Sequence, residues 1–130
     1  MMLRNRKNLQ MKAQEYKLTQ HAQKRMRERG IFFKGVRAAL RNPDVLMDGY
    51  NKEANIWFKY NEGKQKWLAV VFRVCPIDHE SKYIFSVYWS TGQDFIKQCD
   101  HYERRVKWCK QNWGYNPSLV IHSEPVRLKA

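Results

Sequence analysis

The chain has 130 residues, of which 43% are hydrophobic and 14% aromatic, so it can bury one apolar core and is not a wholly disordered chain. No apolar run reaches the roughly 20 residues of a membrane-spanning helix, and the basic start lacks the apolar stretch of a secretory signal, so we expect no membrane partner. Three cysteines without a Cys-x-x-Cys pair argue against a disulfide framework, and we therefore expect a cytoplasmic protein.

Positive charge is concentrated in the first third of the chain. Residues 1–42 hold 12 Lys and Arg against Glu15 and Glu28, a net charge of +10, whereas residues 43–130 hold 13 against 10 acidic residues, a net charge of +3. Concentrated positive charge attracts phosphate polymers and releases their condensed counterions on binding. The pattern favours a nucleic-acid partner; a solubilising basic tail and an acidic protein partner are the alternatives.

The N-terminal segment is expected to contain an arm and two helices. Residues 1–16 are polar and lack a clean period, so we predict a flexible basic arm there. A first helix is expected from Thr19, a good N-cap, to Arg29, because Gly30 can adopt the left-handed conformation that ends a helix. A second helix is expected over 33–41, before an Asn-Pro pair that cannot continue it.

The middle of the chain has the composition of a β-sheet. Aromatic and β-branched residues gather in four segments that turn-forming residues separate. The predicted strands are Val45–Tyr50, Asn55–Tyr60, Lys66–Val74 and Lys82–Trp89. Because the connections are short, we expect an antiparallel four-stranded meander.

A long third helix is expected after the sheet. Thr91 to Asp94 is typical of a capping box that opens a helix, and Gly114 is a suitable terminator. An apolar stripe at helical spacing comprises Phe95, Cys99, Tyr102, Val106, Cys109 and Trp113, with the cysteines as packing residues. The predicted organisation is an arm at 1–16, one α+β domain at 17–115 and an extended tail at 116–130.

The first helix carries the most specific local signal. Its buried side is defined by Leu18, Ala22 and Met26. Arg25 and Arg29 fall at the margins of this side, and His21 lies near one edge. Burying an unpaired charge is costly, so these arginines pair with carboxylates of the sheet or line a groove that receives a phosphate. His21 could then transfer a proton near neutral pH.

Other basic residues of this segment are candidates for contacts with the phosphate backbone. Some belong to the arm and the rest precede the first helix or occupy its solvent side. The predicted nucleic-acid-binding residues are Arg4, Arg6, Lys7, Lys12, Lys17, Lys24 and Arg27.

Residues 19–31 read Thr-Gln-His-Ala-Gln-Lys-Arg-Met-Arg-Glu-Arg-Gly-Ile, and the next helix ends in Leu-Arg-Asn-Pro-Asp. This pattern resembles a family of small bacterial and phage domains with a His-Ala-x-x-Arg-Met-x-x-Arg-Gly-Ile helix followed by a strand meander. The family is grouped with RelE- and barnase-like ribonuclease toxins, and the resemblance covers roughly residues 16–92. The matching positions are His21, Arg25 and Arg29.

The resemblance implies a RelE/barnase-like α+β fold and metal-independent cleavage of RNA. It also implies RNA in preference to DNA as the nucleic acid, and an antitoxin or host target as a protein partner. The chain departs from the family pattern at Phe32-Phe33-Lys34, where relatives place a Ser or Thr and acidic residues that cap the second helix. The arm, the long helix and the tail fall outside the resemblance.

RNA cleavage without a metal needs a base, an acid and cations that stabilise the phosphorane charge, so the sheet must contribute groups. Strand alternation makes Arg73, Ser86 and Tyr88 candidates for a polar face, although each could be an ordinary solvent-facing residue. Together with His21, Arg25 and Arg29 of the first helix, Arg73 and Tyr88 form the predicted catalytic set. Lys59 and Tyr60 are weaker candidates.

No metal or cofactor is expected. The Cys and His residues near the C-terminus lack the close ligand pairs of a structural zinc site. The leading hypothesis is a nucleic-acid-directed protein of the endoribonuclease toxin type. The alternatives are a non-catalytic module that binds DNA or RNA, and a phage or mobile-element protein that binds and modulates a host protein.

Overall fold

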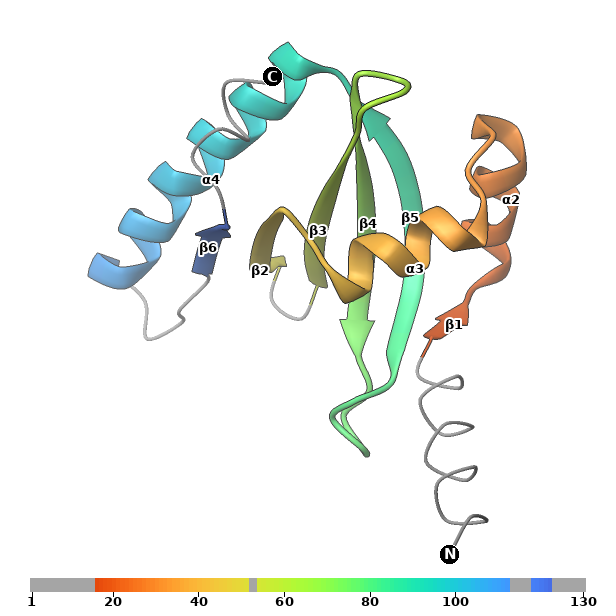
Figure 1. Cartoon of the computed structure of the whole chain (residues 1–130). Helices are drawn as coiled ribbons and strands as arrows, with labels where there is room; N and C mark the ends of the chain where they lie inside the picture. Colours follow the sequence, from red (N-terminus) through yellow and green to blue (C-terminus); the bar gives the residue numbers. More distant parts are fainter. Residues whose placement is uncertain (1–15, 52–53, 113–117, 123–130) are drawn as a thin grey trace, which may run out of the picture.

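The computed structural model describes residues 16–51, 54–112 and 118–122. These residues form a six-stranded sheet with three helices (Figure 1). The elements in chain order are β1 (Tyr16–Leu18), α2 (Gln20–Arg29), α3 (Phe33–Arg41), β2 (Val45–Asn51), β3 (Ala54–Asn61), β4 (Lys66–Val74), β5 (Lys82–Ser90), α4 (Gly92–Asn112) and β6 (Ser118–Ile121). The α+β class is therefore confirmed, whereas the predicted arm over 1–15 lies outside the described residues.

Local signals place both ends of α2 as predicted. The Thr19 side chain accepts a hydrogen bond from the Ala22 backbone N–H at 3.1 Å, which satisfies one of the free donors of the first turn. Gly30 ends the helix in the left-handed conformation, with φ 63°. The predicted limits of α3 are also confirmed, although its N-cap residue Phe32 makes no capping hydrogen bond through its side chain.

The predicted meander is present, because β2, β3, β4 and β5 pair antiparallel in sequence order. The prediction of four strands was nevertheless wrong, since two short edge strands extend the sheet. Tyr16, assigned to the arm, begins β1, which pairs parallel with the start of β5. β6, assigned to the extended tail, pairs antiparallel with β2. Strands of three and four residues are too short to show an alternating period, so only their partners define them.

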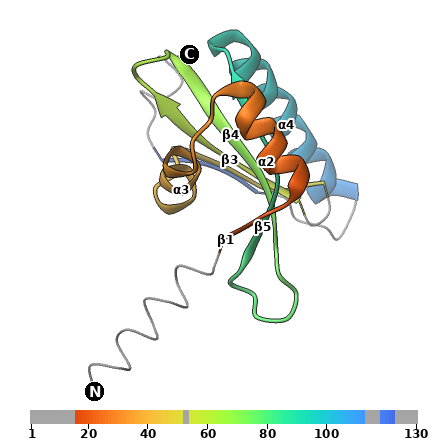
Figure 2. The same cartoon turned by 90° about the vertical axis from the view of Figure 1, so that its right-hand side faces the viewer.

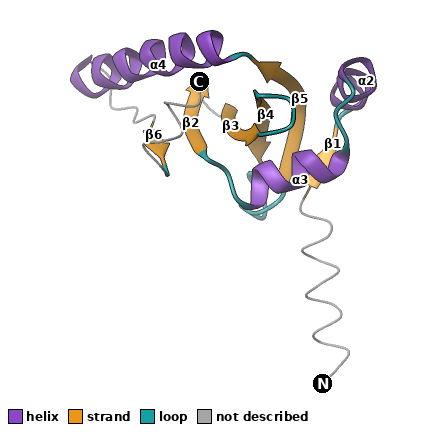
Figure 3. Cartoon of the chain, turned by 45° about the horizontal axis from the view of Figure 1, so that its top comes forward, coloured by secondary structure: helices purple, strands orange, loops and turns teal. Residues whose placement is uncertain are grey.

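α3 and α4 lie on opposite sides of the sheet (Figure 3). An apolar cluster fills each side, and β4 supplies alternate side chains to both clusters. One cluster lies on the α3 face and also receives Ala22 and Met26 from α2; from β4 it takes Leu68, Val70 and Phe72. The other lies on the α4 face and takes Trp67, Ala69 and Val71 from β4. A strand covered on both faces reads as a continuous apolar run, as β4 does.

α4 covers its face of the sheet through the predicted stripe. Phe95, Cys99, Tyr102 and Cys109 are buried, and the Phe95 ring stacks on Trp67 with centroids 4.0 Å apart. Thr91 caps the helix by accepting from the Asp94 N–H, as expected. Trp113 of the stripe lies outside the described residues. None of the helices in the described ranges is long and apolar enough to cross a membrane.

Candidate nucleic-acid interface

α2 lies along the outer edge of β5, beyond the end of β1. Figure 2 looks onto this edge of the sheet and shows α2 in front of β5. His21, Arg25 and Arg29 recur every four residues, so they form a row along one side of α2. This row contains the three positions of the sequence motif.

Arg25, in the middle of this row, is hydrogen-bonded to two other side chains of α2. Arg25 is partly buried; its Nη1 donates to Glu28 Oε2 at 2.9 Å, and its Nε donates to His21 Nε2 at 3.4 Å. In this second hydrogen bond the Arg25 guanidinium donates and the His21 ring nitrogen accepts, so Arg25 occupies the Nε2 side of the imidazole. The carboxylate that pairs with Arg25 therefore comes from its own helix and not from the sheet.

Glu28 is the only acidic residue over 16–42, a range that the structure describes throughout. The hydrogen bond from Arg25 lowers the pKa of its carboxyl, and the positive charges of Arg25, Lys24 and Arg29 act in the same direction. Lys24 Nζ lies 3.8 Å from Glu28 Oε1, and all these side chains are substantially exposed. Exposed ion pairs stabilise a fold weakly. The ion pairs of Glu28 with Lys24 and Arg25 therefore order these side chains and contribute little to the stability of α2.

Arg29 anchors the end of α2 to the sheet. Its Nη1 donates to the Val87 carbonyl of β5 at 2.6 Å, and the Trp89 indole Nε1 donates to the Arg29 carbonyl at 3.0 Å. These bonds run in opposite directions between the same two elements. The sequence predicts that Arg29 pairs with a carboxylate of the sheet or lines a phosphate-binding groove. Its partner in the structure is instead a backbone carbonyl of β5.

The three sheet candidates lie on the face that α4 covers. Ser86 pairs with Val71, and Tyr88 with Ala69; Val71 and Tyr88 both pack against the α4 cluster. Arg73, two residues beyond Val71, lies over the ring of Phe85 at 5.0 Å. The Tyr88 hydroxyl and the side-chain amide of Gln98 on α4 exchange hydrogen bonds at 3.1–3.3 Å. The predicted catalytic residues thus divide between the β5 edge and the α4 face.

The weaker candidates, Lys59 and Tyr60, have structural contacts. Lys59 Nζ lies 3.6 Å from Asp44 Oδ1, and the Tyr60 ring packs edge-on against Trp67 with centroids 4.9 Å apart. Both side chains are therefore engaged by the fold itself.

Of the predicted phosphate contacts, the structure describes Lys17, Lys24 and Arg27, all of which are exposed. Lys17 lies on β1, with Nζ 5.5 Å from the centroid of the Tyr83 ring. Those of the arm, Arg4, Arg6, Lys7 and Lys12, lie outside the described residues. Over 16–42 there are eight Lys and Arg against one acidic residue.

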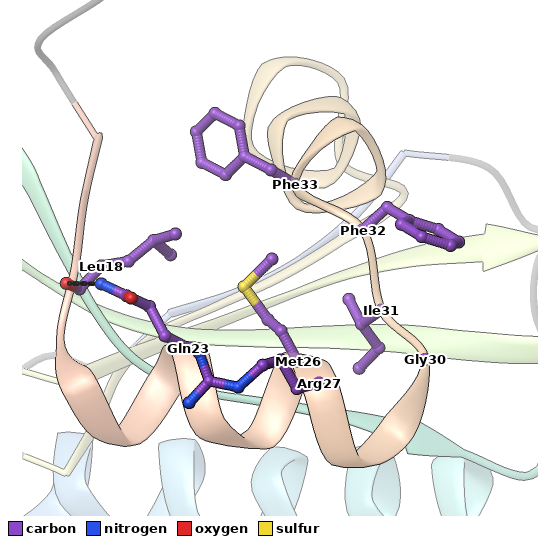
Figure 4. Close-up of a pocket in the computed structure, with 8 residues that line it drawn as sticks. All are labelled: Leu18, Gln23, Met26, Arg27, Gly30, Ile31, Phe32 and Phe33. Atoms are coloured by element: carbon purple, nitrogen blue, oxygen red, sulfur yellow. Dashed lines mark hydrogen bonds between the residues drawn. The ribbon is translucent and has the colours of Figure 1, made fainter.

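The structure adds a feature that the sequence did not predict: two pockets flank the loop between α2 and α3. The first, of about 400 Å³, lies between the two helices, with Met26 and Phe33 on its walls and Arg27 at its side (Figure 4). The second, of about 450 Å³, extends over α3 toward the β3–β4 turn and is lined by Leu68 and Trp89. Gly30, Ile31 and Phe32 line both pockets. We call the loop, both pockets and their basic residues Arg27, Lys34 and Lys64 the loop surface.

Phe32 is the most conspicuous residue of the loop surface, because 79% of it is exposed. The sequence contained a signal for it. Phe32 stands where the resemblance described above implies a polar helix cap, and an aromatic residue there supplies no capping oxygen. No group of three metal-binding side chains occurs within the described ranges.

Fold and geometry define a small α+β domain with a basic helical edge and an exposed aromatic loop. Residues 18–89 match the model of a family described as a domain of unknown function, DUF4258, and the chain belongs to this family. The match includes α2, α3 and the meander, and ends before α4. No curated protein and no solved structure matches the chain. The expected membership of a family of small domains is confirmed in this general form.

Proposed function

We propose that the protein binds nucleic acid through α2, α3 and the loop surface, and that it does so in the cytoplasm. The observation that carries this proposal is the charge balance over 16–42, where eight Lys and Arg face one acidic residue. That residue, Glu28, is itself hydrogen-bonded to Arg25. A phosphate backbone approaching this side of the molecule therefore meets little repulsion.

RNA is proposed in preference to DNA because the α2 motif resembles that of a family of small domains grouped with RelE- and barnase-like ribonuclease toxins. The order of two helices followed by an antiparallel meander supports the same fold assignment. Under that assignment, α2, α3 and the strands β2 to β5 correspond to the shared fold, and β1, α4 and β6 are additional elements. An experimental structure whose meander did not superpose on that fold in the same strand order would remove this support.

Charge reversal at the loop surface tests the binding proposal. The variant Arg27→Glu/Lys34→Glu/Lys64→Glu lowers the net charge from +13 to +7. The matched control, Lys97→Glu/Lys107→Glu/Lys110→Glu, changes exposed residues of α4 by the same total charge. Fluorescence anisotropy with a labelled 12-nucleotide RNA should show a much greater loss of affinity for the loop-surface variant. Its salt slope should fall by about 0.7 for each phosphate that the variant no longer neutralises.

Two results would contradict the binding proposal. Equal reductions of affinity in both triple variants would show that only net charge matters. An affinity that does not change with salt concentration would favour the alternative of a protein partner, such as an antitoxin or host target.

RNA cleavage is a second candidate function, favoured by the position of His21 beside Arg25 at 3.4 Å. If a bound phosphate draws the Arg25 guanidinium away from His21, the released Nε2 can accept the ribose 2′-OH proton while the guanidinium stabilises the phosphate charge. His21→Ala should therefore reduce cleavage in the presence of EDTA by roughly 10²-fold or more. The control is His101→Ala, an exposed histidine of α4. Identical decay of RNA with wild type and His21→Ala would exclude this candidate.

A further inference from the structure

The exposure of Phe32 follows from the backbone that joins α2 to α3. Phe32 has φ −94° and ψ 151°, an extended conformation in which neighbouring side chains point to opposite sides. Ile31 is 5% exposed and Phe33 packs against the same cluster, so Phe32 is directed outward.

Single exposed apolar residues are common, but the surroundings of Phe32 are not those of an isolated one. It forms part of the wall of both pockets of the loop surface. The pocket of about 450 Å³ falls in the size range of ligand sites, and a second aromatic residue, Trp89, lines it. The Trp89 indole is held in place by its hydrogen bond to the Arg29 carbonyl.

The charged residues of the loop surface are all basic. Arg27 lines the first pocket, and Lys34 and Lys64 line the second; among the described residues that line the two pockets, none is acidic. Lys64 Nζ lies 5.3 Å from the centroid of the Trp89 ring. An aromatic platform between cations is the arrangement that binds single-stranded nucleic acid, since the ring stacks on a base while the cations contact the adjoining phosphates.

We propose that Phe32 stacks on an unpaired base, which enters the pocket shared with Trp89 while the flanking phosphates contact Arg27, Lys34 and Lys64. The inference rests on the proposed nucleic-acid binding and deepens it by naming single strands as the ligand class. A duplex does not satisfy this site, because its bases are already stacked on one another.

The test compares Phe32→Leu with wild type and Phe32→Trp on two probes, a 12-nucleotide single-stranded RNA and a duplex of the same length. Leucine keeps apolar bulk but lacks an aromatic face, so it separates stacking from simple apolar contact. We expect Phe32→Leu to weaken single-strand binding roughly 5- to 150-fold, with duplex binding unchanged and Phe32→Trp close to wild type. The salt slope should stay constant, because no charge is removed.

The matched control is Ile77→Ala, which alters an apolar residue that is 88% exposed between β4 and β5. This variant should bind both probes as wild type does. A single strand containing 2-aminopurine gives a direct readout of stacking. Its fluorescence should be quenched by wild type and not by Phe32→Leu at saturating protein.

Other results would contradict either the stacking inference alone or the proposed nucleic-acid binding as a whole. If Phe32→Leu binds the single strand as wild type does, or binds both probes more weakly by the same factor, the stacking inference is wrong while nucleic-acid binding stands. Unchanged 2-aminopurine fluorescence on wild-type binding also overturns it. Failure of the wild-type protein to bind either probe at low salt contradicts the proposed function itself.

Discussion

The segment containing α2 and α3 differs from α4 in both charge and attachment. Over 16–42 there are eight basic residues against one acidic residue, whereas α4 has five against three. α4 is attached by a long stripe of buried side chains, and α2 buries only Ala22 and Met26. The end of α2 is attached instead by the Arg29 and Trp89 hydrogen bonds. α4 therefore forms a structural layer, while α2 and α3 leave a basic surface exposed, which is the surface proposed to bind nucleic acid.

The largest test of this comparison uses one phenylalanine from each region. Phe95→Ala should lower the free energy of unfolding by about 3–5 kcal/mol, because it opens a cavity beneath α4 at a fully buried ring. Phe32→Ala should change it by less than about 0.5 kcal/mol, since its ring is mostly exposed. Urea unfolding measures both. Similar destabilisation by the two variants would contradict the view that α4 is a structural layer and that Phe32 belongs to an exposed surface with little role in stability.

Arginines on α2 give the next largest effect. Arg29→Ala should cost about 1–2 kcal/mol of unfolding free energy, because it removes a charged donor to the Val87 carbonyl. The value lies toward the low end for charged hydrogen bonds, since Arg29 is exposed. Arg27→Ala is the control and should be nearly neutral for stability while weakening nucleic-acid binding. A neutral Arg29→Ala would show that Arg29 does not anchor the helix.

The cap of α2 gives an effect of about 1 kcal/mol. Thr19→Ala removes the oxygen that accepts from the Ala22 N–H and should destabilise the protein by that amount in thermal or urea unfolding. Thr19→Ser keeps the oxygen and should remain close to wild type. If both substitutions cost the same, packing of the Thr19 methyl group, and not capping, holds the start of α2.

The smallest effect concerns pH. The pKa of Glu28 is lowered, chiefly by the hydrogen bond from Arg25, so its contribution to stability is present above its ordinary value of 4.5. That contribution disappears as the pH falls through the lowered pKa, when the folded state also takes up the proton. The difference in unfolding midpoint between wild type and Glu28→Gln should therefore shrink below pH 4.5. A difference that persists unchanged in strong acid would mean that Glu28 acts other than through its charge.

Much of the fold could be predicted because its signals are local. Thr19 and Gly30 mark the two ends of α2 by capping chemistry, and the limits of α3 and β4 coincide with the predicted ones. The stripe of α4 follows from helical periodicity, and its described members are buried or partly buried. These features depend on residues a few positions apart, so the chain itself contains the information.

The site was less accessible to prediction, because its contacts join distant parts of the chain. The partner of Arg29 is a backbone carbonyl 58 residues away, which has no residue-type signature. Trp89 reaches the loop surface only because β5 lies beside α2. The sequence motif indicated that His21, Arg25 and Arg29 lie in one row. Only the structure showed that Arg25 is hydrogen-bonded to His21, whereas Arg29 is hydrogen-bonded to β5 and anchors the end of the helix.

By itself the sequence determined that this is a basic α+β domain with a capped first helix, a short second helix, a meander and a long amphipathic helix. Caps, periodicity and charge are properties of neighbouring residues, so they can be recognised without coordinates. Only the tertiary structure decided that β1 and β6 complete the sheet and that Phe32 lies between two pockets. Edge pairing and pocket shape depend on which distant segments meet, and no local pattern encodes that.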